Sequence, residues 1–203
     1  SDNARAAFRA AYPDHSTRLT PGLVGHPLLT IASLADLAER MPASRVEYNL
    51  GKLPLGVRAE DTPSNGLSLH DTILTIETNG SWAVLKNVEQ DPAYAALLDA
   101  ALAELEPIVR ASTGPMLNRE AFIFLSSPGS VTPLHMDPEH NILLQIMGQK
   151  IMTVFPARDE MLVPPQQSES FHNGGHRNLT WRDDFRAHGE AVTLEPGDAV
   201  HVP

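Results

Sequence analysis

The sequence predicts a mainly β domain, a barrel or sandwich, that follows a mostly helical N-terminal elaboration. After Gly114 and Pro115, short runs rich in Ile, Val, Phe and Leu alternate with Pro and Gly, which is typical of repeated short strands. Before that point, several segments carry apolar residues at helical spacing. We therefore expect a helical elaboration over 1–115 and a β domain over 116–203. The 203 residues, 42% of them hydrophobic, are enough to form a core.

The helical elements of the first half are predicted from spacing and capping residues. Thr30 is a suitable N-cap for a helix over 31–41. Residues 69–78 are ambiguous, because their Thr and Ile residues favour a strand while their apolar positions fit one helical face; we expect a helix. The helix over 92–112 is opened by Asp-Pro and is kinked or split at Pro107. The remaining expectations are a helix over 4–11, strands over 45–50 and 82–86, and a loop over 51–66.

The second half is predicted to form strands. The candidates are 120–126, 131–136, 141–147, 150–155, 191–194 and 199–202. Gly148 and Gln149 separate two of these runs and predict a hairpin between them. Residues 157–190 form a long polar insertion rich in His and Arg, which is either a functional loop over the site or a plain surface excursion.

Composition excludes several classes of function. With no Cys there is no disulfide, thiol nucleophile or thiolate metal site, so any metal must be held by His and carboxylates. The net charge of −10 and the lack of a basic cluster argue against a nucleic-acid partner. No apolar run reaches the length of a membrane span, and no export signal opens the chain, so the cytoplasm is the expected compartment.

His135 and Asp137 form the strongest candidate for chemistry. Because they are two residues apart, they project from the same face of an extended segment. One imidazole and one carboxylate are two-thirds of the facial triad of non-haem Fe(II) oxygenases. Such a pair also occurs as an ordinary His and Asp at a strand end.

The residues that follow this pair add polar groups to apolar segments. Asn141 and Gln145 share one face of the run 141–147, with Ile142 and Leu144 on the other, and buried amides need partners. Lys150 is one of only three lysines and either pairs with a buried anion or extends to water from a turn.

Two motifs resemble the Jumonji-C oxygenases, in particular the cupin-like hydroxylases typified by an asparaginyl hydroxylase. The first is Thr132-x-x-His135-x-Asp137-x-x-x-Asn141-x-x-x-Gln145-x-x-Gly148-x-Lys150, followed by Thr153-x-Phe155-Pro156. The second is the run from Val192 to Pro203, which is similar to the Gly-Asp-x-x-x-x-Pro strand of that family. The resemblance covers residues 116–203 and implies a double-stranded β-helix, the cupin or jelly-roll barrel.

The resemblance also implies an activity and its cofactors. It implies an Fe(II)- and 2-oxoglutarate-dependent oxygenase that hydroxylates a protein side chain or a small molecule. His135 and Asp137 would be iron ligands, Lys150 and Thr132 would bind the distal carboxylate of 2-oxoglutarate, and Asn141 would lie near its metal end. Phe122 or Phe124 would line the pocket, and Ile142, Leu144, Ile146 and the run 120–126 would help to form its apolar interior. Relatives often form homodimers, so a homodimer is a further expectation.

The third iron ligand of that family is a His a few residues beyond the Gly-Asp-x-x-x-x-Pro strand. The sequence stops at Pro203, inside this strand, so we expect a longer protein. The alternative is a non-catalytic cupin-like module that binds a ligand or regulates a partner. A third reading is another cupin metalloenzyme, such as an isomerase, in which Lys150 and Thr132 would have no dicarboxylate to hold.

Overall fold

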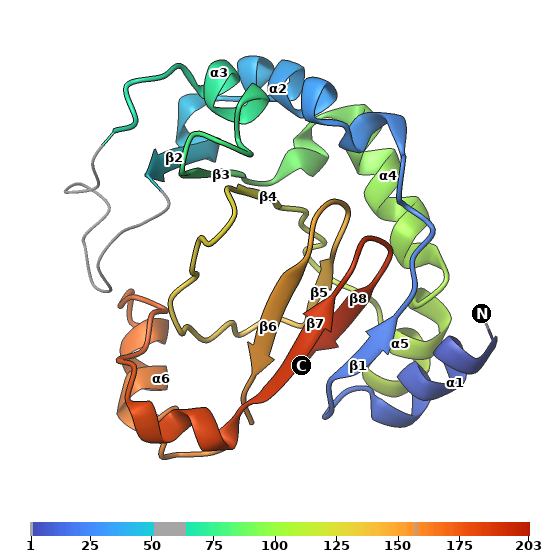
Figure 1. Ribbon diagram of the computed structural model, residues 1–203. Coiled ribbons are helices and arrows are strands. Elements are labelled where there is room, and N and C mark those ends of the chain that lie inside the picture. The colour runs from blue at the N-terminus through green and yellow to red at the C-terminus, as the bar shows by residue number, and fades with distance from the viewer. Residues whose placement is uncertain (1, 51–63, 157) are drawn as a thin grey trace. The chain divides into compact units, whose positions relative to one another are not determined.

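The computed structural model describes residues 2–50, 64–156 and 158–203, so most of the predicted loop over 51–66 lies outside the described residues (Figure 1). The chain divides into two compact units. The first contains Ser1–Val24, Ile108–Gly114 and Pro133–Pro203, and the second contains Gly25–Pro107 and Pro115–Thr132. The predicted boundary near residue 115 stays a prediction.

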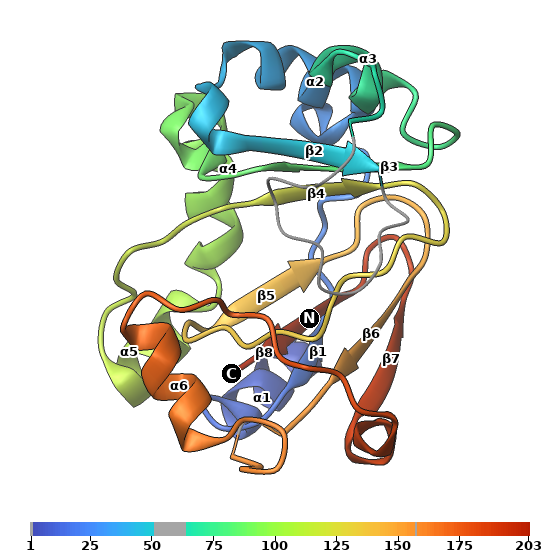
Figure 2. The ribbon, with the colours of Figure 1, turned by 90° about the vertical axis from the view of Figure 1, so that its left-hand side faces the viewer.

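The second unit is an antiparallel sheet covered on one face by helices (Figure 2). Its strand order is β2 (Val46–Leu50), β3 (Ser81–Leu85), β4 (Ile123–Ser126). The covering helices are α2 (Ile31–Arg40) and α3 (Leu69–Leu74). The described part of this unit also contains the 3-10 turns η1 (Pro27–Leu29), η2 (Ala43–Arg45) and η4 (Val88–Gln90) and the longer helix α4 (Pro92–Ala103).

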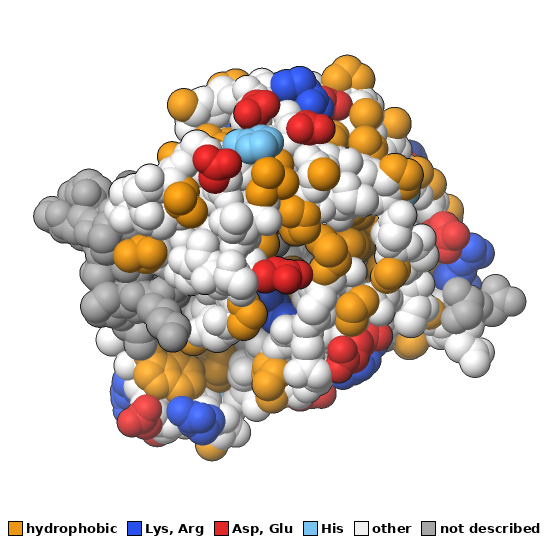
Figure 3. All heavy atoms as spheres, turned by 45° about the horizontal axis from the view of Figure 1, so that its top comes forward, with side chains coloured by type: hydrophobic (Ala, Val, Ile, Leu, Met, Phe, Trp, Pro, Cys, Tyr) orange, Lys and Arg blue, Asp and Glu red, His pale blue; other side chains and the backbone are white. Residues whose placement is uncertain are grey.

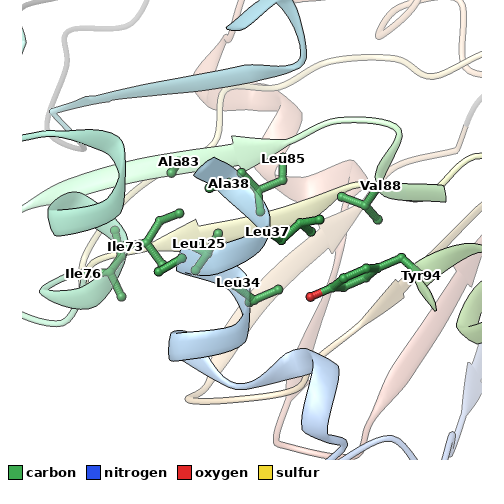
Figure 4. Packing of buried hydrophobic residues seen from close by; sticks show 11 residues of the cluster. Leu34, Leu37, Ala38, Ile73, Ile76, Ala83, Leu85, Val88, Tyr94 and Leu125 are labelled. Atoms are coloured by element: carbon green, nitrogen blue, oxygen red, sulfur yellow. The ribbon is translucent and has the colours of Figure 1, made fainter. Parts of the chain in front are cut away.

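The core of the second unit lies between these helices and the sheet (Figure 4). Leu37 of α2, Ile73 of α3 and Leu85 of β3 are each at most 1% exposed. Burying one such side chain contributes about 1.5–3 kcal/mol to stability. The Tyr94 hydroxyl at the edge of this core donates to the Leu28 carbonyl oxygen at 2.7 Å. The helix predicted over 69–78 is confirmed for Leu69–Leu74 and ends in turns, from which Ile76 still packs into the core.

The predicted helix starts are confirmed by capping hydrogen bonds. The Thr30 hydroxyl accepts from the Ser33 amide, and the Asp91 carboxylate accepts from the Ala93 amide. The predicted helix over 92–112 is split, because α5 (Glu106–Thr113) begins just before Pro107. Pro107 stands in the first turn, where a missing amide hydrogen costs nothing.

The first unit contains two antiparallel sheets. One has the order β1 (Thr17–Leu19), β8 (Ala199–Val202), β5 (Asn141–Leu144), and the other pairs β6 (Lys150–Val154) with β7 (Glu190–Leu194). A small core joins them, formed by Val192, Leu194 and Val200 with Leu143, Met152 and Val202. The prediction of a mainly β domain is confirmed for this part, and the described strands leave the barrel open.

The predicted hairpin between 141–147 and 150–155 is wrong. β5 pairs with β8, while β6 pairs with β7. The first ladder continues beyond Leu144, since the Gln145 amide donates to the Asp198 carbonyl and the Gly197 amide donates to the Gln145 carbonyl, both at 2.9 Å. The chain therefore turns at Gly148, which has a positive φ of 66°, but crosses from one sheet to the other.

Two further strand predictions need correction. The run 131–136 forms no strand but a single bridge between His135 and Asn178. The apolar face is also the opposite of the expected one. Leu143 lies opposite Val200 in the shared core, whereas Ile142 lies opposite His201 on the other face.

The outer face of the β1–β8–β5 sheet is covered by α1 (Asp2–Ala11), which confirms the predicted N-terminal helix. Phe8 of α1 is 1% exposed and meets the His201 ring edge-on, with centroids 5.2 Å apart. The insertion over 157–190 is partly ordered as α6 (Pro165–His172) and η5 (Asp183–His188). Leu162 and Phe185 of this insertion are buried, so the insertion packs against the rest of the unit through apolar side chains.

None of the described helices is both long and apolar enough to span a membrane. On the face drawn in Figure 3, acidic and basic side chains lie scattered among apolar and uncharged ones.

Candidate metal and co-substrate site

His135 and Asp137 lie side by side in the first unit. The distance from His135 Nε2 to Asp137 Oδ2 is 3.5 Å. Main-chain hydrogen bonds fix this segment against residues 177–179 of the insertion: the Met136 amide donates to the Arg177 carbonyl, and the Leu179 amide donates to the Leu134 carbonyl. The backbone therefore holds the two side chains together although it forms no regular strand here.

The His135 ring is oriented by its own backbone. Its Nδ1 lies 2.8 Å from the carbonyl oxygen of Pro133. Because a carbonyl only accepts, Nδ1 carries the hydrogen, and Nε2 is the nitrogen available to a metal. A carbonyl that fixes the tautomer of a ligating His is the usual outer partner in metal sites.

The Asp137 carboxylate has partners on both oxygens. Asn141 Nδ2 donates to Oδ2 at 2.8 Å, and Arg177 Nη1 donates to Oδ1 at 2.6 Å. The Oδ2 atom therefore lies between the amide of Asn141 and the ring of His135. Asn141 is the first residue of β5 and lies on the same face as Leu143, the inner face that packs in the shared core. The amide that the sequence places on this strand therefore has the Asp137 carboxylate as its partner.

The pair is electrostatically coupled. The Asp137 carboxylate raises the pKa of His135, and the His135 imidazole, together with the Arg177 guanidinium, lowers the pKa of Asp137. A divalent cation beside Oδ2 would take the place of the proton on Nε2, since a ligating imidazole is neutral.

The residues present fit a metal such as Fe(II) in type but not in number. One imidazole and one carboxylate suit Fe(II), Mn(II) or Zn(II) with open positions. In the described ranges, no group of three or more His, Asp or Glu side chains is placed to hold one ion. The pair thus offers two of the ligands that such an ion needs.

Lys150 lies on the inner face of β6. It stands opposite Leu194 and on the same side of the strand as Met152, both of which belong to the shared core. Burial lowers the pKa of Lys150. Within the described parts of the chain it has no ion-pair partner, whereas Lys86 in the second unit pairs with Glu47. A half-buried, unpaired ammonium on an inward face is suited to bind an anion.

Thr132 and the two predicted pocket aromatics belong to the second unit. Thr132 is exposed at the end of that unit, so its role toward His135 and Asp137 stays a prediction. Phe122 and Phe124 are 40% and 59% exposed, with ring centroids 6.4 Å apart. They form an exposed aromatic pair.

A model of the family described as "Cupin-like domain" matches residues 59–203. The chain belongs to this family. Three relatives are similar over shorter stretches. "Lysine-specific demethylase 8" of Danio rerio is 35% identical over 81 residues, which is 37% of this chain and 20% of the relative. "JmjC domain-containing protein D" of Dictyostelium discoideum is 44% identical over 57 residues, or 28% and 13%. "Lysine-specific demethylase JMJ30" of Arabidopsis thaliana is 51% identical over 83 residues, or 37% and 19%.

These matches confirm the resemblance to Jumonji-C and cupin-like proteins. The matched stretches span about a fifth or less of each relative. What those relatives do as whole proteins therefore bears on this cupin-like chain only as a proposal.

Sequence reasoning missed two features of this cupin-like chain. Arg177 is 40 residues from Asp137 in sequence, and only the fold brings them together. His201 is 1% exposed and faces α1, although its place in an apolar run gave no sign of a special environment. Its Nε2 lies 3.2 Å from His140 Nδ1, and its own Nδ1 has no hydrogen-bond partner among the described residues.

Proposed function

We propose that this cupin-like chain carries part of the active site of an Fe(II)- and 2-oxoglutarate-dependent oxygenase that hydroxylates a protein side chain or a small molecule. The observation that carries the proposal is the oriented pair. The Pro133 carbonyl fixes the His135 tautomer, which leaves Nε2 3.5 Å from Asp137 Oδ2. Bound Fe(II) would supply the redox chemistry with dioxygen that protein side chains lack.

In this proposal each polar residue has a defined task. His135 and Asp137 hold the metal, and Asn141 fixes the Asp137 carboxylate through its 2.8 Å hydrogen bond. Lys150 pairs with the distal carboxylate of 2-oxoglutarate, and Thr132 adds a hydroxyl to the same carboxylate. The half-buried position of Lys150 supports this role, because an ion pair strengthens as water is excluded.

The apolar inner face of the two sheets has a task of its own. Leu143, Met152 and Val200 lie on this face and keep water away from the co-substrate. Exclusion of water protects a reactive centre from side reactions.

The substrate class is proposed from the names of the relatives. Two of them are named lysine-specific demethylases. A lysine side chain of a protein, either methylated or as a site of hydroxylation, is therefore the first substrate to test.

The deciding experiment measures succinate formed from 2-oxoglutarate by the full-length protein with Fe(II). We expect turnover in the wild type and its loss in His135→Ala and Lys150→Ala. His172→Ala and Lys86→Ala are the matched controls, because His172 is exposed on α6 and Lys86 lies in the second unit. Turnover that survives His135→Ala would contradict the metal assignment.

A second candidate is a non-catalytic module that binds a dicarboxylate and regulates a partner. It is favoured by Lys150, whose half-buried ammonium on the inner face of β6 is suited to bind a dicarboxylate whether or not a metal is held. Binding of 2-oxoglutarate without succinate formation in the full-length protein would select this candidate.

A further inference from the structure

Arg177 touches the proposed metal pair from outside the motif that predicts it. Its Nη1 lies 2.6 Å from Asp137 Oδ1 and 3.8 Å from Glu139 Oε1. Its Cζ lies 5.9 Å from the centre of the Phe171 ring of α6. A carboxylate, a second carboxylate and an aromatic face thus hold the guanidinium in one place.

The backbone of Arg177 is held as firmly as its side chain. Its carbonyl accepts from the Met136 amide at 3.1 Å, and two residues later the Leu179 amide donates to the Leu134 carbonyl at 2.9 Å. The bridge between His135 and Asn178 lies between these bonds. Residues 177–179 of the insertion therefore run beside the segment that carries His135 and Asp137. These main-chain bonds place Arg177 within hydrogen-bond distance of Asp137.

The two oxygens of Asp137 have separate neighbours. Arg177 binds Oδ1, whereas His135 Nε2 faces Oδ2. A metal held between His135 and Asp137 uses Oδ2, which Arg177 does not contact and which accepts one hydrogen bond, from Asn141 Nδ2. We propose that Arg177 is a positioning residue: it fixes the rotation of the Asp137 carboxylate and so raises the affinity of the pair for a divalent cation. This inference rests on the proposed function.

The guanidinium of Arg177 has two opposing effects on the affinity for a cation. Its positive charge repels a bound cation, while its hydrogen bond holds the carboxylate in the binding orientation. Glu139, 3.8 Å from the same Nη1, balances much of the charge, and a side chain that is 42% exposed is further screened by water. The ordering effect therefore dominates, and outer partners of metal ligands typically change metal affinity by about 10- to 100-fold.

The test compares Arg177→Met, Arg177→Lys and Arg182→Met in the full-length protein. Arg182 is the matched control, because it lies in the same insertion but pairs with Asp184. The dissociation constant for Mn(II) is read from the loss of the free-ion electron paramagnetic resonance signal, with and without 2-oxoglutarate, and melting temperatures are recorded in parallel. We expect Arg177→Met to bind Mn(II) about 10- to 100-fold more weakly, with partial recovery in Arg177→Lys and no change in Arg182→Met.

The outcomes separate the inference from the proposed function. If the wild type binds Mn(II) and Arg177→Met binds it equally well or more tightly, the positioning role is overturned while the metal site stands. If the wild type binds no Mn(II) in either condition, the proposed function is overturned, and the positioning role with it. A loss of affinity that Arg182→Met shares would also overturn the inference, because it would reflect the insertion in general.

Discussion

Asn141 Nδ2 donates to Asp137 Oδ2 at 2.8 Å, and this bond ties the first residue of β5 to the proposed metal pair. The contact joins two polar positions of one motif, four residues apart. It leaves Oδ2 oriented toward His135, whose Nε2 is 3.5 Å away. The strand β5, which packs in the shared core, thereby supports His135 and Asp137, which lie on a segment outside any regular strand.

Asn141→Leu should weaken the site without unfolding the first unit. The variant removes the donor to Oδ2, so the Asp137 carboxylate keeps its hydrogen bond from Arg177 but loses the one from Asn141. We expect Mn(II) affinity to fall by about tenfold and the free energy of unfolding to fall by about 1 kcal/mol. Titration with Mn(II) and urea denaturation measure the two effects. Gln167→Leu on α6 is the control, and equal metal affinity in Asn141→Leu and the wild type would contradict the assigned role.

Lys150→Met should weaken the binding of 2-oxoglutarate without lowering the free energy of unfolding. The variant keeps the length of the side chain but removes a charge that burial makes costly, as the lowered pKa of Lys150 indicates. Calorimetric titration should give 2-oxoglutarate affinity reduced by about 10- to 100-fold, which corresponds to the loss of a charge-assisted hydrogen bond. The ligand-free variant should be at least as stable as the wild type. Lys86→Met should bind 2-oxoglutarate normally, and a similar loss there would argue against Lys150 as the anchor.

The sequence predicted most elements because their signals are local. The caps Thr30 and Asp91 act within three residues of themselves. Pro107 could not lie inside a continuous helix, so the helix over 92–112 is split at this residue. The short strand β1 was missed because three residues carry too little pattern.

The pairing of strands could not be predicted in the same way. Gly148 indicated a turn, and the turn exists, but whether β6 folds back on β5 or crosses to β7 depends on partners more than 35 residues away. The inner face was assigned wrongly for the same reason, since only the pairing of Leu143 with Val200 identifies it. Arg177 was missed because its contact with Asp137 follows from that long-range arrangement.

Gly189→Ala should test the close approach of the insertion to β6. A Cβ atom at Gly189 would lie 2.5 Å from Thr153 Cγ2 and 2.6 Å from the Phe155 ring, which is closer than packed atoms approach. We expect the free energy of unfolding to fall by about 1–3 kcal/mol. Gly22→Ala is the matched control, because nothing lies within 4 Å of its added Cβ and its backbone is unstrained. Urea denaturation of both variants gives the comparison, and equal stability would show that the backbone shifts freely at Gly189.

His201 should make the stability of the protein depend on pH. Burial, with a smaller effect of His140, lowers the pKa of His201 from 6.5 to about 4 in the folded protein. The Phe8 ring of α1 and the ring of Tyr12, just after this helix, lie against it, so a charged imidazole cannot be hydrated there. The unfolded chain therefore binds more protons than the folded one between pH 6.5 and 4, and the free energy of unfolding falls as the pH drops through this range, by about 3 kcal/mol in total.

His201→Leu should remove this dependence. The variant has no group to protonate and leaves no buried ring nitrogen without a partner, so its urea midpoint should change less between pH 7 and pH 4.5 than that of the wild type. The exposed His172→Leu serves as the control and should follow the wild type. Parallel curves for His201→Leu and the wild type would mean that other groups govern the loss of stability in acid, and that His201 stays neutral or finds a partner on protonation.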